Sequence, residues 1–178
     1  LLMAELRAYL RALATTRPHA SEILMLANRF LSADLEEHRF VTLFFARLDP
    51  VAGSLTYASA GHNAYLLKAS GEVETLDSTG LPLGLIADTI INTGFPVPFE
   101  PGDLLFIPTD GFQEAHTDQN ELYGLDRMLE FVASHRDEPS ATIISKLRDE
   151  VCRFVGKPLI QDDMSGIIAR RMIDSGGE

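Results

Sequence analysis

Asp103-Leu-Leu-Phe-Ile-Pro-Thr-Asp-Gly-Phe-Gln-Glu114 joins a short apolar segment to a cluster of polar residues. Leu104 to Ile107 has the length of a buried strand, and Pro101-Gly102 before it is typical of a turn. Asp110 follows the strand, and Gly111 allows the backbone to turn sharply after it. A carboxylate in this position can bind a hard cation, or it can belong to an ordinary Asp-Gly turn.

A second pair of carboxylates, Asp162 and Asp163, precedes another apolar segment near the end of the chain. If the two apolar strands pair, their ends could bring Asp110 within ~5 Å of this pair. Carboxylates that close repel each other unless they share a cation or a proton. Oxygen ligands favour Mg²⁺ or Mn²⁺ over zinc, and two such ions can activate a water and hold a phosphoryl group. The residues alone leave this site as one option beside a simple turn.

The composition is typical of a globular protein, with 46% hydrophobic and 23% charged residues. The length of 178 residues predicts one domain over 1–178. A net charge of -11 argues against a nucleic-acid partner. The single Cys152 excludes an intramolecular disulfide, and no apolar run approaches the ~18 residues of a membrane span. With no visible signal peptide, these features predict a cytoplasmic protein.

Hydrophobic periodicity predicts helices grouped apart from hairpin-linked strands, which is an α+β fold and not a βαβ alternation. Helices are expected over 1–15, from about 19 to 31, around 125–132 and from about 140 to 155; strands are expected over 40–48, 54–60, 64–68, 73–76, 89–99, 104–107 and 164–172. The strand over 40–48 is apolar on both alternating faces, so we expect it to be covered on both sides.

An ordered series of short motifs spans nearly the whole chain. The motifs are Phe40-Val-Thr-Leu-Phe-Phe-Ala-Arg-Leu-Asp-Pro50, Tyr57-Ala-Ser-Ala-Gly-His-Asn63, Leu81-Pro-Leu-Gly84, Pro101-Gly-Asp103, Thr109-Asp-Gly111 with Glu114-Ala115, and Asp162-Asp-Met-Ser165. In this order they resemble the bacterial SpoIIE/RsbU-type serine phosphatases, a branch of the PP2C (PPM) metal-dependent protein phosphatases. The resemblance runs from the first residue to about Met172. It implies a PP2C-like antiparallel β-sandwich flanked by helices.

The resemblance also implies a set of site residues. Asp110 and Asp162 match the family's catalytic aspartates, which bind two Mn²⁺ or Mg²⁺ ions, and Gly111 would contribute its backbone. Asp163 is expected to be the weaker ligand, because neighbouring residues of a strand point to opposite sides. His62 stands where other PP2C enzymes have an aspartate for a third metal. His62 and Glu114 are expected to support the site from outside the metal ligands, or else to be turn residues.

The family carries a further aspartate, which bridges both metals, in a segment before a helix that resembles residues 1–6. That segment is not in this sequence, and the first predicted helix begins without a cap. We therefore expect an N-terminally incomplete phosphatase domain. The alternative is a catalytically silent, phosphatase-like module that binds a partner. A haloacid-dehalogenase-like enzyme is disfavoured, because its nucleophilic aspartate would fall at Pro108.

The resemblance implies a phosphorylated protein as substrate and phosphoserine or phosphothreonine hydrolysis as the reaction. The expected substrate is a phosphorylated anti-sigma-factor antagonist in bacterial stress or developmental signalling. An upstream sensor or receiver domain is expected to control the activity. The oligomeric state stays open, with a dimer as one option.

Overall fold

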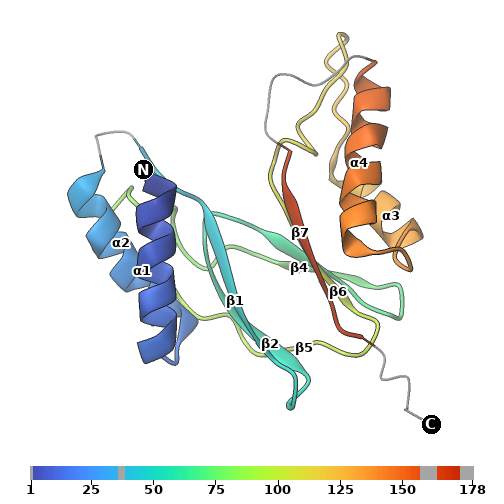
Figure 1. The fold of residues 1–178 in the computed structure, drawn as a ribbon. Coiled ribbons are helices and arrows are strands. Elements are labelled where there is room, and N and C mark those ends of the chain that lie inside the picture. Colours follow the sequence, from blue (N-terminus) through green and yellow to red (C-terminus); the bar gives the residue numbers. More distant parts are fainter. Residues whose placement is uncertain (1, 36–38, 157–163, 173–178) are drawn as a thin grey trace. The chain divides into compact units, whose positions relative to one another are not determined.

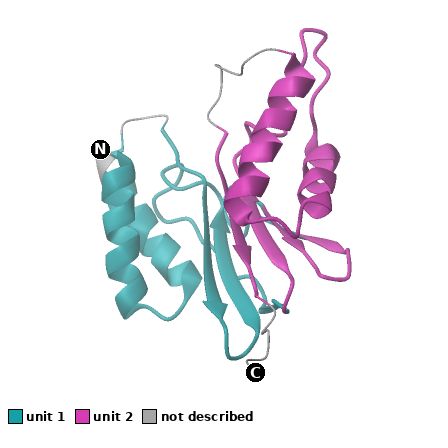
Figure 2. Cartoon of the chain, turned by 45° about the vertical axis from the view of Figure 1, so that its right-hand side comes forward, with its two compact units in different colours: residues 1–63, 75–100 teal, residues 64–74, 101–178 magenta. Residues whose placement is uncertain are grey.

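The computed structural model describes residues 2–35, 39–156 and 164–172, which fall into two compact units (Figures 1 and 2). The first unit comprises residues 1–63 and 75–100, and the second comprises residues 64–74 and 101–178. Within the described residues the order is two helices, six strands, two helices and one strand, as the sequence predicts. No helix among these residues combines the length and the hydropathy that a membrane crossing requires.

The first unit packs two helices against a three-stranded sheet. Its elements are α1 (Leu2–Thr16), α2 (Ala20–Asp34), β1 (Leu43–Asp49), β2 (Ser54–Ala60) and β5 (Val97–Pro98). The sheet order is β1-β2-β5, and both pairings are antiparallel. Its core combines Leu6 of α1 and one apolar face of α2 with residues of the sheet and loops: Leu6, Ala20, Leu24, Ala27, Leu31, Ala58, Ala60, Leu83 and Ile91.

The predicted apolar face of the second helix is confirmed. Ala20, Ile23, Leu24, Ala27 and Leu31 are all buried. Their spacing of three or four residues places them on one side of a helix with 3.6 residues per turn.

The prediction for the first strand is wrong in two respects. β1 begins at Leu43, and it forms an edge of its sheet because only β2 pairs with it. Phe40 is 55% exposed and Leu48 is 47% exposed, so neither is covered as predicted. An edge strand has one neighbour in place of two, so one row of its backbone N–H and C=O groups has no strand partner. Phe40 precedes the strand, and Leu48 lies close to its end.

The predicted long strand over 89–99 is also wrong, because only Val97–Pro98 is a strand. Pro96 and Pro98 have no N–H group to donate to a ladder. At Gly94 a Cβ atom would lie 2.5 Å from the Tyr57 ring. Ahead of β5, the Gly94 N–H group donates to the Tyr57 carbonyl oxygen of β2 at 2.8 Å.

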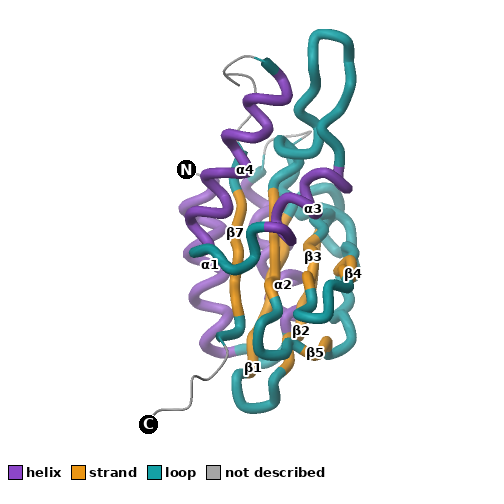
Figure 3. The backbone as a smooth tube through the Cα atoms, turned by 90° about the vertical axis from the view of Figure 1, so that its right-hand side faces the viewer, coloured by secondary structure: helices purple, strands orange, loops and turns teal. Residues whose placement is uncertain are grey.

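The second unit contains a sheet and the last two helices (Figure 3). Its elements are β3 (Ala64–Leu67), β6 (Leu104–Pro108), β7 (Gly166–Arg170), α3 (Leu125–Ser134) and α4 (Ser140–Val155), and β4 (Val73–Leu76) begins in it and ends in the first unit. The sheet order is β4-β3-β6-β7, and β6 pairs antiparallel with both β3 and β7. α4 packs against β7 and buries four residues at spacings of four: Ile143, Leu147, Val151 and Val155.

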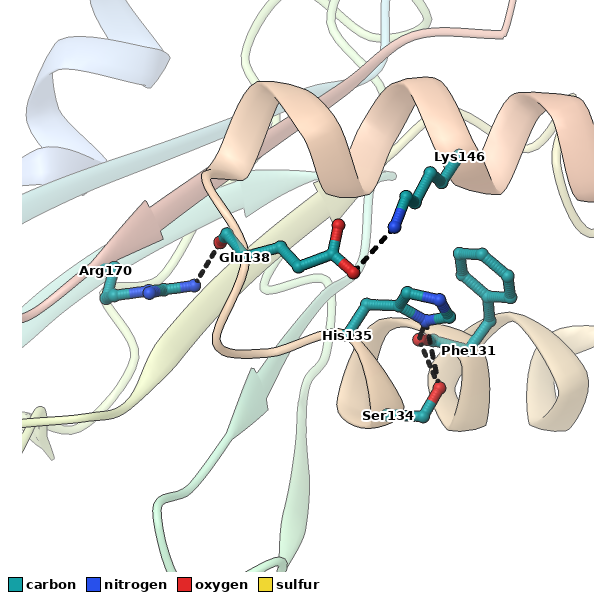
Figure 4. A network of polar contacts seen from close by, with 6 residues as sticks. All are labelled: Phe131, Ser134, His135, Glu138, Lys146 and Arg170. Atoms are coloured by element: carbon teal, nitrogen blue, oxygen red, sulfur yellow. Dashed lines mark hydrogen bonds and ion pairs between the residues drawn. The ribbon is translucent and has the colours of Figure 1, made fainter.

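Arg170 of β7 fastens the turn between α3 and α4 to the sheet (Figure 4). Its guanidinium donates to the Glu138 carbonyl oxygen at 2.7 Å and to the Arg136 carbonyl oxygen. Arg136 in turn donates to the carbonyl oxygens of Lys68 and Gly102, at 3.0 and 2.9 Å. Two half-buried arginines thus satisfy four backbone acceptors and hold the helical pair on the strands.

Candidate active site

The ends of β6 and β7 meet, as the sequence predicts for the strands that carry the two groups of aspartates. The last pair of the ladder joins Pro108 to Gly166. One residue further, the Thr109 N–H group donates to the Ser165 carbonyl oxygen at 2.8 Å. Asp110 therefore follows directly on a strand end that is bound to the start of β7.

Asp110 is exposed, while the two residues after it are buried. Phe112 is fully buried in the core of the second unit, which anchors the chain immediately beyond the aspartate. The Glu114 N–H group donates to the Asp110 carbonyl oxygen at 2.9 Å and closes a turn. The buried anchor and the closed turn hold the backbone of Asp110, and its carboxylate is left at the surface.

Gly166 allows β7 to start close to the same core. A Cβ atom there would lie 2.9 Å from Ile144 Cδ1 and 3.3 Å from a ring carbon of Phe106. It would also lie 3.6 Å from a ring carbon of Phe112, the residue that anchors the Asp110 turn. The glycine after Ser165 therefore has a packing role, which sequence reasoning did not identify.

The Asp110 carboxylate is an oxygen donor of the kind that hard cations prefer. No described residue forms an ion pair with the Asp110 carboxylate. Asp162 and Asp163 lie outside the described residues. Among the residues that the structure does describe, no group of three or more His, Cys, Asp or Glu side chains could hold a metal. An oxygen donor of this kind fits Mn²⁺ or Mg²⁺, and the metal-binding roles of Asp110, Gly111, Asp162 and Asp163 stay predictions.

His62 belongs to the first unit, in the turn that follows β2. Its N–H group donates to Ser59 Oγ at 3.3 Å, and its carbonyl oxygen accepts a bond from the same hydroxyl. The neighbouring Gly61 has φ +69°, a conformation that favours glycine. The backbone of His62 is thus held in the turn by a buried serine. A supporting role for His62 or Glu114 in metal binding stays a prediction.

Sequence reasoning missed the buried Asn28. Its Nδ2 atom donates to the carbonyl oxygens of Ile86 and Ala87, each at 2.8 Å, and its Oδ1 atom accepts from the Gly84 N–H group at 2.7 Å. This side chain fixes the Leu81-Pro-Leu-Gly84 motif and the residues after it. The signal in the sequence was a single polar residue on the apolar face of the second helix.

A hollow of about 570 Å³ lies on α3 and α4. Tyr123 and Phe154 meet edge to face in it, at 5.4 Å between ring centroids. Burial raises the pKa of Tyr123 above its ordinary value, and the charge of Arg127 opposes this shift. Arg127 is itself paired with Glu121 at 2.7 Å. The hollow is aromatic and partly acidic, so it lacks the character of a phosphate site.

The family model for stage II sporulation protein E (SpoIIE) matches residues 1–172. The chain therefore belongs to the SpoIIE family. It is 26% identical over 175 residues to phosphoserine phosphatase RsbU of Bacillus subtilis (strain 168), a match that covers 97% of this chain and 51% of RsbU.

Two solved structures show the fold. The RsbU and RsbW domains of Rv1364c from Mycobacterium tuberculosis match with a TM-score of 0.76 and 23% identity, over 96% of this chain and 47% of that one. The catalytic domain of the serine threonine protein phosphatase PstP, in complex with two manganese ions, matches with a TM-score of 0.68 and 16% identity, over 97% of this chain and 81% of that one. The predicted PP2C-like α+β fold is confirmed. The chain spans about half the length of RsbU and of the Rv1364c chain.

Proposed function

We propose that this protein is a Mn²⁺- or Mg²⁺-dependent serine/threonine protein phosphatase. The observation that carries the proposal is the pairing of β6 with β7, which binds the strand end before Asp110 to Ser165. Asp162 and Asp163 stand only three and two residues before Ser165 in the sequence. The name of RsbU, a phosphoserine phosphatase, and the two manganese ions of PstP support the same chemistry.

Asp110 and Asp162 are the residues that would hold the two ions, with Gly111 contributing its backbone. Asp163, the neighbour of Asp162, is the weaker candidate. When bound, such ions polarise a phosphoryl oxygen and activate the attacking water. The exposed carboxylate of Asp110 supplies an oxygen ligand at the surface, where a phosphorylated side chain of another protein has access.

The backbone around Asp110 is suited to hold a ligand in one orientation. On one side it is bound to β7 through Thr109, and on the other it is anchored by the buried Phe112. A ligand that is already oriented loses little conformational freedom when a metal binds, which strengthens binding.

The substrate is proposed to be a phosphorylated anti-sigma-factor antagonist in bacterial signalling, by resemblance to the RsbU branch of the family. An upstream sensor or receiver domain would regulate the activity, and RsbU itself extends well beyond the matched half. We also propose a cytoplasmic location. The one cysteine, Cys152, would remain a free thiol in that compartment.

The test is phosphate release from an aryl phosphate and from a phosphoserine-bearing protein by the natural full-length protein. Metals are first removed with a chelator, and manganese is then returned stepwise. The proposal expects activity to disappear on chelation and to return with manganese. Turnover that resists chelation would exclude a metal-dependent phosphatase. Absence of turnover at saturating manganese would favour a catalytically silent module that only binds a partner.

A further inference from the structure

Thr109 and Ser165 are joined by three hydrogen bonds. The Thr109 N–H group donates to the Ser165 carbonyl oxygen at 2.8 Å. The Thr109 hydroxyl donates to the same carbonyl oxygen at 3.1 Å. The Ser165 N–H group then donates to the Thr109 hydroxyl oxygen at 3.0 Å. One side chain thus both donates to and accepts from the backbone of a residue 56 positions later in the chain.

The threonine hydroxyl takes a place that belongs to the backbone in a regular sheet. In a hydrogen-bonded antiparallel pair, each residue donates its N–H group to the carbonyl oxygen of the other. Here the Ser165 N–H group bonds to the hydroxyl instead of to the Thr109 carbonyl oxygen. The peptide group between Thr109 and Asp110 can therefore turn away from the ladder, while the two strand ends stay bound. The hydroxyl thus allows the regular ladder to stop just before Asp110 while β6 stays bound to the start of β7.

The first unit contains the same arrangement. The Thr79 N–H group and hydroxyl donate to the Ser59 carbonyl oxygen at 3.0 and 3.1 Å, and the Ser59 N–H group donates to the Thr79 hydroxyl at 2.9 Å. This second set of bonds joins Thr79 to Ser59 of β2, and neither residue is close to Asp110 in the sequence. It provides a chemically identical set of bonds for comparison.

We propose that Thr109 is a positioning residue of the metal site, whose hydroxyl fixes Asp110 relative to the start of β7. The inference rests on the proposed function, since it concerns the same metal ions. Partners that orient a metal ligand strongly affect metal affinity, although they do not touch the metal themselves. The hydroxyl acts on Asp110 through one peptide bond and on the start of β7 through Ser165.

The sheet itself does not depend on this hydroxyl. Five residue pairs hold β6 to β7, from Leu104–Arg170 to Pro108–Gly166, and the core beneath them is apolar. Removing the hydroxyl should therefore loosen the strand ends, which keep the bond from the Thr109 N–H group, while the fold persists. This separates a positioning role from a general contribution to stability.

The test compares Thr109→Val, which removes the hydroxyl at nearly constant shape, with Thr109→Ser, which keeps it. Thr79→Val removes the same set of hydroxyl bonds in the first unit and is the matched control. Manganese affinity is measured by calorimetry on the natural full-length protein, and phosphate release is measured against manganese concentration.

We expect Thr109→Val to weaken manganese binding by about tenfold or more, within the range seen for residues that orient metal ligands. The manganese concentration for half-maximal activity should rise by the same factor, and saturating manganese should restore most of kcat. Thr109→Ser should stay close to the wild type. Thr79→Val should weaken manganese binding far less than Thr109→Val, whatever it does to stability.

The inference, but not the proposed function, would be overturned by wild-type manganese affinity in Thr109→Val, or by an equal loss of affinity in Thr109→Val and Thr79→Val. An equal loss in Thr109→Ser would also contradict it, because the hydroxyl is retained there. A wild-type protein that binds no manganese would overturn the proposed function as well. The wild-type titration therefore distinguishes the two failures.

Discussion

Gly61 should tolerate alanine poorly, because two separate penalties apply to it. Its φ of +69° is a left-handed conformation that costs a residue with a Cβ atom about 1 kcal/mol. The new Cβ atom would also lie 2.4 Å from Cγ and 2.9 Å from Cδ of Pro82. Carbon atoms normally approach to about 3.5 Å or more, so the proline would have to move by roughly 1 Å.

Pro82 is poorly placed to move. Leu83, the next residue, exchanges backbone bonds with Val41 at 2.8 and 2.9 Å, and the Gly61 N–H group is itself bonded to the Gly80 carbonyl oxygen at 3.0 Å. A rigid ring between these bonds cannot change rotamer to relieve the contact. Overpacking of this kind costs about 1 to 3 kcal/mol, so we expect Gly61→Ala to lose about 2 to 4 kcal/mol in total.

Gly156 provides the matched control. Its φ is +77°, and a Cβ atom there would meet no atom of the described residues within 4 Å, so Gly156→Ala should lose only about 1 kcal/mol. Both variants are measured by urea unfolding, with the midpoint and the slope fitted separately. Equal losses of stability in the two variants would refute the assignment of the extra cost to Pro82. A loss below about 1 kcal/mol in Gly61→Ala would refute the strain argument too.

Three further outcomes are expected. Asn28→Leu should lower the free energy of unfolding by about 3 kcal/mol, at about 1 kcal/mol for each of its three bonds to the 84–87 segment, and a loss under about 1 kcal/mol by urea unfolding would contradict this. The pKa of Tyr123 is raised because burial in the fold favours the neutral phenol. The contribution of the neutral phenol to the free energy of unfolding is therefore complete below pH 10.0, the ordinary pKa, and is lost as the pH rises through the raised pKa. Urea unfolding across that range should show a smaller alkaline loss in Tyr123→Phe, and an unchanged profile would contradict the prediction. Asp162→Asn should reduce manganese affinity and phosphatase rate more than Asp163→Asn, and the reverse order would exchange their assigned roles.

The order of elements was predictable because each element carries a local signal. The apolar face of α2 repeats at helical spacing, and Gly156 ends α4 in the left-handed conformation typical of a helix C-terminus. A strand was predicted over 89–99 because several apolar residues of this segment alternate as in a strand. Pro96 and Pro98 withhold the N–H groups that a ladder needs, and this outweighed the pattern.

The pairing behind the candidate site was predictable only as a hypothesis. The sequence indicates that Asp110 follows one strand and that Asp162 precedes another. It does not predict the register that pairs Pro108 with Gly166. The three bonds between Thr109 and Ser165 had no local signal, since Thr and Ser are common and their partners are far apart in sequence. The role of Gly166 depends on side chains from other elements, so it too required the structure.

The most direct test of the metal site is manganese binding by Asp110→Asn, measured by calorimetry on the natural full-length protein. Asp137→Asn is the control, because it removes one exposed carboxylate from the same unit, in the turn between α3 and α4. The account predicts that Asp110→Asn loses most of the manganese affinity and the phosphatase activity with it, while Asp137→Asn retains both. Wild-type manganese affinity in Asp110→Asn would contradict the account.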